Sequence, residues 1–466
     1  MSFVQLDYLA FLLLVIGLFQ LVPERRRTGF LLLASVVFYL HDRPIYLALL
    51  ATSCFLDFAV GLGLGRTEDP RSRRWLLGCS LVGNLGLLSA FKYAGVILGE
   101  APAPTAANPV LGGSPGLPLG ISFYTFQTLG YSIDVFRGRI RPCRDWAQYA
   151  LFVSFFPQLI CGPIERARHL LPQLTRLQLL SAANTSLGLR WILWGLAKKL
   201  VIADRFRPLL LEIFHHPEGV DSLTLVTVNL GLLVILYLDF SGYLDIARGT
   251  AVLFGVRLVP NFRFPFLATS VGAFASRWHI SLMSWMQENI YRPLMRWRTG
   301  TAGVLWINVL VFGLVGLWHG ARWTYILCWG SAGVMVTLEQ WLRRRRRAGA
   351  ASSRPAVGAL AWLVTMLYLA LFTAGFYSLE MKTATANLRS LFGGGLPGSE
   401  ALPLLGRMLG LLAVGLVLHA AGSRVNLTQV WTRVGWVGRT AWFLLLAGIV
   451  LRFQVVEIQP FDYFRF

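Results

Sequence analysis

Charged residues are scarce in this sequence, and their scarcity excludes a soluble protein. Only 14% of the 466 residues are Asp, Glu, Lys or Arg, 55% are hydrophobic, and the mean hydropathy is +0.59. Soluble domains carry about 25% charged residues. Apolar runs of roughly 17 to 25 residues, long enough to cross a bilayer, recur along almost the whole chain. We therefore predict an all-α polytopic membrane protein with a single integral domain over residues 1–466.

Acidic residues and cysteines are also few. The 22 acidic and 43 basic residues give a net charge of +21, and the basic residues gather in short loops between apolar runs. Because the positive-inside rule explains this pattern, we expect anionic lipids or the phosphates of a cytosolic donor as partners, and no nucleic acid. The five cysteines show no close pairing, so no metal site or redox pair is expected.

The apolar runs divide the chain into three parts. Residues 1–98 predict four membrane-crossing helices, with no signal peptide and an outside N-terminus, because basic residues follow the first run and none precedes it. Residues 117–341 form the core, and 356–466 contain three more runs, near 356–378, 402–421 and 438–455. About 10–12 crossings result, and the Pro- and Gly-rich stretch 100–116 is an expected exported loop.

Some apolar segments carry polar residues or prolines that a lipid-facing helix would not tolerate. Asp134 lies in the run 117–138, and a charge there costs roughly 2.5–3.5 kcal/mol, so this helix is predicted to line an interior. The segment 155–174 contains three prolines and is predicted to be re-entrant or interfacial. Further spans are expected at 184–203 and 222–247, with His215 and His216 solvated in the loop between them. Asp245 and Arg248 can pair at i and i+3, and a structural ion pair and a substrate role stay equally open for them.

His319 is the candidate centre of the site, within GLWHGARWTYILCWG (316–330). An imidazole in apolar surroundings is either a hydrogen-bonded core residue or a base for chemistry near neutral pH. His279 lies on a predicted interfacial helix, 274–291, and two helices could bring both rings together. The neighbouring Gly316 and Gly320 predict a close approach of helices. The tryptophans beside His319 are expected to be packing residues and interface anchors.

Eight segments, in order, resemble the membrane-bound O-acyltransferase family, in the bacterial branch that acetylates alginate or transfers D-alanine to teichoic acid. They are FKYAG (91–95), LPLGISFYTFQ (117–127), FFPQLICGPI (155–164), KKLVIAD (198–204), LDFSGYLDIARG (238–249), PNFRFPF (260–266), RWHISLMSW (277–285) and GLWHGARWTYILCWG (316–330). The chain departs from this pattern at 292–300, where a glycine-rich turn is missing, at 331–333, where SAG replaces a histidine, and in its last six residues. A partner's contact surface is what these departures put in question.

The resemblance implies a membrane-bound O-acyltransferase fold, with transmembrane and re-entrant or interfacial helices around a central tunnel, in the bacterial cytoplasmic (inner) membrane. It implies acyl transfer, with acetyl expected, from a cytoplasmic thioester, acyl-CoA (acetyl-CoA) or an acyl-carrier-protein thioester, with no tightly bound cofactor. The acceptor would be a hydroxyl of an exported polysaccharide or cell-envelope polymer, or of a periplasmic relay protein. A lipid, protein or small-molecule acceptor is the alternative, and a transporter or scaffold without catalysis is a further one.

The resemblance also assigns roles to residues. His319 matches the family's general base, whose contribution is about 10²- to 10⁴-fold. His279 matches a second histidine, which would orient the donor or polarise its carbonyl, with a structural role equally open. The candidates for lining the donor tunnel are Asp134, Asp239, Asp245, Arg248, Trp318, Trp323 and Arg277.

Overall fold

The computed structural model is helical almost throughout, which confirms the all-α prediction. It describes residues 3–41, 44–93, 120–297, 300–347, 355–393 and 433–453, with scattered positions in 107–118 and 406–431. Within these residues the only strands are β1 (Ala107–Asn108) and β2 (Ser114–Pro115), paired antiparallel. The chain forms two compact units, one of residues 1–197 and 242–259, the other of residues 198–241 and 260–464.

The first unit begins with four helices where the sequence predicts four membrane crossings, and two of them, the third and the fourth, are long and apolar enough to cross. The four helices are α1 (Leu6–Phe19), α2 (Arg27–Leu40), α3 (Pro44–Leu64) and α4 (Pro70–Lys92), with the short 3-10 turn η1 (Glu24–Arg26) before α2. The start of α4 is set by Asp69, whose carboxylate accepts a hydrogen bond from the Ser72 amide, and by proline at the first helical position. α1 and α2 have 14 residues each, fewer than the roughly 20 that a straight crossing needs.

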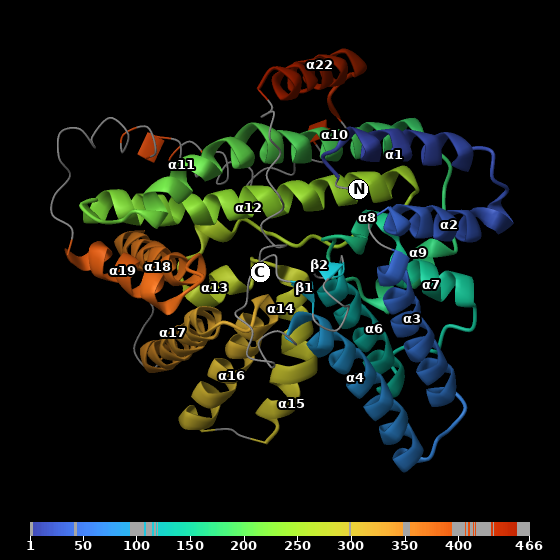
Figure 1. Ribbon diagram of the computed structural model, residues 1–466, viewed down its shortest axis with the longest axis horizontal. Helices are drawn as coiled ribbons and strands as arrows, with labels where there is room; N and C mark the ends of the chain where they lie inside the picture. The colour runs from blue at the N-terminus through green and yellow to red at the C-terminus, as the bar shows by residue number, and fades with distance from the viewer. Residues whose placement is uncertain are drawn as a thin grey trace. The chain divides into compact units, whose positions relative to one another are not determined.

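The remaining helices of the first unit include the predicted interior helix. They are α6 (Ile121–Phe136), α7 (Trp146–Ser154), α8 (Phe156–Leu159), α9 (Ala167–Leu174), α10 (Ala182–Leu196) and the C-terminal part of α12 (Ser222–Leu253). Nearly every side chain of α6 is buried, which confirms the prediction from its polar residues, and α6 packs against α3 and α4 (Figure 1). The segment 155–174 is not a straight helix, and its residues 155–165 are buried, as irregular backbone within a membrane protein requires.

A buried polar cluster joins α3, α4 and α6. The carboxylate of Asp57 on α3 accepts hydrogen bonds from Ser80 and Asn84 on α4 and from Ser132 on α6. Because hydrogen bonds satisfy these groups within the protein, the cluster connects the three helices where hydrocarbon would offer no partner.

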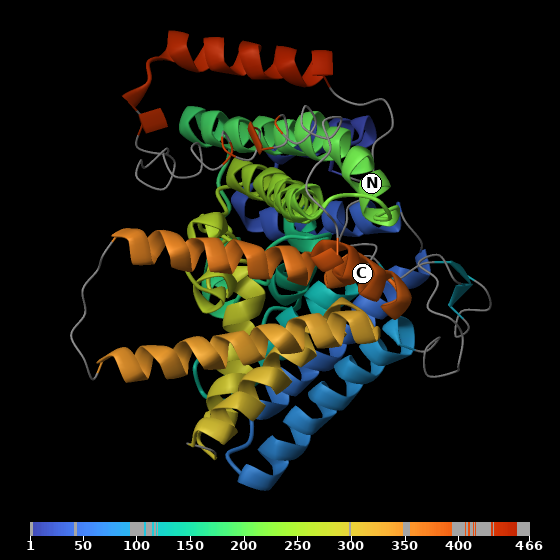
Figure 2. The same ribbon diagram turned by 90° about the vertical axis from the view of Figure 1, so that its left-hand side faces the viewer.

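The second unit is built from the N-terminal part of α12 and a series of helices on either side of it in the sequence. Before α12 come the π-helix η3 (Ala197–Ala203) and α11 (Asp204–His215). After it come η4 (Pro265–Leu267), α13 (Val271–Ala275), α14 (Ile280–Met286), the π-helix η5 (Gln287–Tyr291), α15 (Arg292–Met295), α16 (Thr301–His319), α17 (Trp323–Arg347), α18 (Pro355–Phe376), α19 (Met381–Gly393) and α22 (Trp436–Phe453). α16 and α17 lie side by side (Figure 1 and Figure 2).

Gly316 allows this close approach, as the sequence predicted. A Cβ atom there would lie 2.5 Å from the carbonyl oxygen of Tyr325 on α17. A Cβ atom at Gly320 would lie 2.9 Å from the ring of the same tyrosine. A larger side chain at Gly316 would therefore push the two helices apart, and one at Gly320 would displace the Tyr325 ring.

Six helices of the described residues are long and apolar enough to cross a membrane: α3, α4, α12, α16, α18 and α22. The expected 10–12 crossings counted shorter runs as well, and the run 402–421 lies almost entirely outside the described residues. The exported loop predicted at 100–116 also falls mostly outside them, as does the C-terminal hexapeptide.

Two local predictions were wrong. The expected helix 274–291 is broken, because α13 ends at Ala275 and α14 starts at Ile280, with His279 between them. Most of the expected loop before α12 is helical as α11, despite Pro208. The two histidines at 215–216 are exposed, as predicted.

Candidate functional site

His319 ends α16 and is packed within aromatic rings. Its side chain is 2% exposed, and its ring stacks on Trp329, with centroids 5.3 Å apart and planes 12° apart. Edge contacts come from Trp318, at 4.7 Å, and from Phe376 of α18, at 5.1 Å. Side chains from three helices thus fix the plane of this imidazole.

His279 precedes the first residue of α14 and is equally buried. Its ring makes edge contacts with Phe240 of α12, at 5.0 Å, and with Trp318, at 5.7 Å. Burial lowers the pKa of His279 to about 3, so its imidazole is neutral at physiological pH. Since Trp318 touches both His279 and His319, the second unit brings the two predicted histidines to one aromatic cluster.

The backbone around His279 is strained. His279 has φ 44° and Phe264 has φ 49°, and they are the only non-glycine residues with positive φ in the described part of the chain. Each such conformation costs about 1–3 kcal/mol and persists only where surrounding contacts impose it. The segments that carry them are held together by hydrogen bonds, among them one from the Arg263 amide to the Arg277 carbonyl (3.0 Å).

An apolar cavity of about 40 Å³ adjoins His319. Trp329 and Phe376 line it together with residues of α12, α13, α14, α16, α17 and α18, and its wall contains two ionisable side chains, His319 and Tyr368. One water-sized atom needs about 10–15 Å³ of this volume, so the cavity has room for about three of them. It could hold the end of a short acyl chain next to the imidazole.

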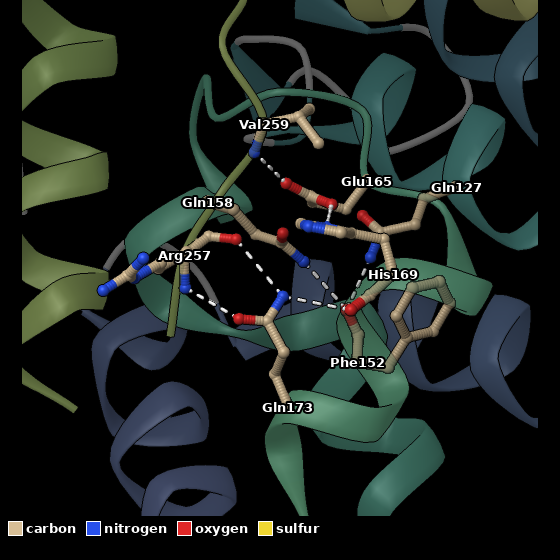
Figure 3. Close-up of polar contacts among 8 residues, drawn as sticks. All are labelled: Gln127, Phe152, Gln158, Glu165, His169, Gln173, Arg257 and Val259. Atoms are coloured by element: carbon tan, nitrogen blue, oxygen red, sulfur yellow. Dashed lines mark hydrogen bonds and ion pairs between the residues drawn. The ribbon is translucent and has the colours of Figure 1, made fainter. Parts of the chain in front are cut away.

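A separate polar cluster in the first unit holds the segment that follows α12. Glu165 accepts hydrogen bonds from the Val259 amide (2.6 Å) and from His169 Nδ1 (2.7 Å) (Figure 3). The Gln173 side chain accepts from the Arg257 amide and donates to the Arg257 carbonyl, as a neighbouring β-strand would. The hydrogen bond with Glu165 raises the pKa of His169.

Sequence comparison agrees with this architecture. A sequence model of the membrane-bound O-acyltransferase family matches residues 144–378, half of the chain. The probable alginate O-acetylase of Azotobacter vinelandii is 32% identical over 98% of both chains. The chain belongs to the membrane-bound O-acyltransferase family. Two further relatives are the peptidoglycan O-acetyltransferase of Helicobacter pylori, 31% identical over 78% of this chain and 73% of that protein, and the teichoic acid D-alanyltransferase of Streptococcus thermophilus, 27% identical over 51% and 61%.

As a membrane-bound O-acyltransferase, the protein is an enzyme that transfers acyl groups. The six long apolar helices found in the described part of the chain make it a multi-pass membrane protein. Among the described residues, no group of three or more His, Cys, Asp or Glu side chains could hold a metal ion.

The residues that the resemblance suggested for the donor tunnel of this membrane-bound O-acyltransferase lie in different parts of the structure. Asp134 pairs with Arg139 at 3.2 Å in the first unit. There too, the guanidinium of Arg248 lies 4.4 Å from the centre of the Trp191 ring, and Asp245, buried on the same helix, is a charged neighbour of Arg248. Trp323 is 70% exposed at the start of α17, as an interface anchor would be, whereas Trp318 is buried. Arg277 donates to the Phe264 carbonyl (3.4 Å).

Asp239 belongs to a buried ionic cluster that the sequence did not reveal. Its two carboxylate oxygens accept from Lys199 (2.7 Å) and Arg207 (2.8 Å), and Lys199 also pairs with Asp204 (2.7 Å). All four side chains are fully buried, and their formal charges cancel. The stretch KKLVIAD contains Lys199 and Asp204, but its charges read as the end of a membrane span, because a π-helix is not visible in apolar periodicity.

Proposed function

We propose that this membrane-bound O-acyltransferase moves a short acyl group, acetyl, from a cytoplasmic thioester to a hydroxyl of an exported polysaccharide or cell-envelope polymer, or of a relay protein that serves it. The observation that carries the proposal is the position of His319, a buried histidine fixed by aromatic rings in the wall of a small apolar cavity. A base held in one orientation beside a space for an acyl group suits acyl transfer.

In the proposed reaction His319 acts as general base. It takes the proton of the acceptor hydroxyl as that oxygen attacks the carbonyl carbon of the thioester. The C–O bond forms, the C–S bond breaks, and the departing sulfur receives the proton from the imidazolium. The products are an ester and a free thiol, so no oxidant, reductant or metal is needed.

His279 would act as a neutral partner in this reaction. A histidine with a pKa of about 3 does not accept a proton near neutral pH, but a neutral imidazole can donate one N–H hydrogen bond. We propose that it polarises or orients the donor carbonyl. Trp318 would keep the two imidazoles at a fixed separation, because its ring contacts both.

The acyl group and the acceptor are proposed on different grounds. The cavity of about 40 Å³ suits an acyl group of two or three heavy atoms, which favours acetyl. The acceptor class follows from relatives whose names specify alginate, peptidoglycan and teichoic acid. The donor would be acetyl-coenzyme A or an acyl-carrier-protein thioester reaching the enzyme from the cytoplasm, in the bacterial inner membrane, through a tunnel.

Some tunnel candidates fit this proposal better than others. Asp134 and Asp239 have ion-pair partners that account for their burial, so we do not assign them to the donor. For Asp245 and Arg248 a structural role and a donor role both stay open. Arg277 lies two residues from His279 and could meet a donor phosphate.

The test is acyl transfer by the purified protein in lipid nanodiscs, supplied with radiolabelled acetyl-coenzyme A or acetyl-carrier protein and with alginate, peptidoglycan and teichoic acid fragments. His319→Ala serves as the comparison, with its folding checked by thermal unfolding. Label on a polymer that disappears in the folded variant would support the proposal. Equal label in both proteins would refute the general-base role, and label only on a lipid or a small molecule would refute the acceptor class.

A further inference from the structure

The helix that follows His279 receives its N-terminal cap from elsewhere in the chain. His279 occupies the N-cap position of α14, but its side chain makes no capping hydrogen bond. The first amides of a helix lack partners within the helix, and the N-cap side chain usually accepts from one of them. In this protein the first two amides of α14 both donate to Asn261. The amide of Ile280 donates to the Asn261 carbonyl oxygen (2.9 Å), and the amide of Ser281 donates to the Asn261 Oδ1 atom (2.8 Å).

We propose that Asn261 is a positioning residue for His279. Asn261 supplies the capping acceptors that an N-cap side chain usually supplies. The side chain at 279 therefore does not have to turn towards the start of α14. The imidazole can then face Phe240 and Trp318, with which it makes its ring contacts. The inference rests on the proposed function of His279, because positioning affects catalysis only if that ring takes part in it.

The surroundings of Asn261 support this role. Its side chain is 3% exposed, and the next residue, Phe262, packs edge-on against Phe240 (5.3 Å) and Trp278 (5.1 Å), the neighbours of His279. The strained residues at 264 and 279 lie in the two segments that Asn261 joins. Strain of this kind persists where surrounding bonds over-determine the backbone, and it gathers at functional sites.

The side-chain oxygen of Asn261, Oδ1, is the atom that this proposal tests. Its amide nitrogen, Nδ2, has no hydrogen-bond partner among the residues that the structure describes. Aspartate keeps an oxygen at the capping position and ranks with asparagine as an N-cap. Asn261→Asp should therefore preserve both capping bonds. Asn261→Ala keeps the bond from the Ile280 amide to the backbone carbonyl but loses the bond from the Ser281 amide, so the start of α14 should loosen.

The experiment compares both variants in nanodiscs by two measurements. Amide hydrogen exchange of peptides covering residues 276–291 reports whether the start of α14 is still fixed. The kcat and KM of acetyl transfer report how much this fixing contributes to catalysis. For Asn261→Ala we expect faster exchange in this stretch and a kcat about 10- to 100-fold lower, with KM changed less than about 3-fold. For Asn261→Asp we expect exchange and kcat close to those of the wild type.

A matched control is Asn308→Ala, which removes another buried asparagine amide of the same unit, one that donates to Thr337 Oγ1 (2.8 Å). It should leave exchange at 276–291 unchanged. Wild-type exchange and kcat in Asn261→Ala would overturn the proposal, and so would an Asn261→Asp protein whose exchange at 276–291 is as fast as that of Asn261→Ala. Exchange needs no substrate. It therefore decides the positioning claim even if His279→Ala keeps full activity, a result that would refute only the proposed role of His279.

Discussion

The rings of His319 and Trp329 are stacked almost in parallel, with their centroids 5.3 Å apart. Trp329 belongs to α17, so the stack joins the last residue of α16 to the neighbouring helix. An aromatic pair contributes about 0.5–1.5 kcal/mol beyond its buried area. The indole face therefore restricts the tilt of the imidazole that we propose as the base.

Trp329→Leu should lower kcat by about 3- to 10-fold, because that interaction holds the base in orientation. Trp329→Phe retains an aromatic face and should lose less. The measurement is the kcat of acetyl transfer for each folded variant. A leucine variant as fast as the wild type would show that the stack does not orient the base.

Phe372 lines the cavity beside His319, and shortening its side chain should alter the choice of acyl group. For Phe372→Leu we expect the ratio of kcat/KM for butyryl over acetyl donor to rise by about 10-fold, the usual worth of added methylene contacts. Phe214→Leu is the control, since Phe214 is fully buried in a different cluster of the same unit. An unchanged ratio in Phe372→Leu would show that the acyl group does not bind in this cavity.

Gly316 and Gly313 lie on the same helix but face different surroundings. A methyl group at Gly316 would meet the Tyr325 carbonyl oxygen, whereas at Gly313 it would meet nothing within 4 Å. Gly316→Ala should therefore destabilise the protein by about 1–3 kcal/mol through overpacking. Gly313→Ala should be neutral or stabilising by up to about 1 kcal/mol. Thermal unfolding of the two variants checks this, and equal shifts would contradict the close approach of α16 and α17.

Lys199 is the shared cation of the buried ionic cluster. Lys199→Met should destabilise the fold by about 3–5 kcal/mol, because it leaves the carboxylate of Asp204 buried without a partner. Burial already raises the pKa of Asp204. The double variant Lys199→Met, Asp204→Asn should recover part of the loss, since the orphaned charge is gone. A double-mutant cycle on the unfolding midpoint measures this coupling, and strict additivity would argue against the ion pair.

The pair of His169 and Glu165 should make stability depend on pH. Because the pKa of His169 is raised in the folded state, its contribution is fully present below the unfolded pKa of about 6.5 and is lost as pH rises through the folded value. His169→Gln should therefore flatten the fall in unfolding temperature between about pH 6 and pH 8. His215→Gln, at an exposed histidine, is the control and should keep the wild-type slope.

The sequence was sufficient where apolar length or local polarity decides the structure. The helices of residues 1–98, the buried course of α6 and the close approach at Gly316 followed from such patterns. The break at His279 did not, because the amides that follow it donate hydrogen bonds to Asn261, a residue distant in sequence. The ionic cluster around Asp239 escaped for a similar reason: a π-helix turns Lys199 towards α12, and no periodicity in the sequence indicates that turn.

The two hydrogen bonds between the Gln173 side chain and the Arg257 backbone, here called the clamp, bear on which substitutions position 257 tolerates. Gln173 holds this position through its backbone amide and carbonyl, and nothing in those two bonds depends on the side chain that residue 257 carries. Any amino acid with a backbone N–H could be held in the same way, and only proline would break the clamp. Substitutions at 257 should thus be freely tolerated, while Gln173→Ala would remove both bonds whatever residue stands at 257 and leave the segment to the Glu165 bond with Val259.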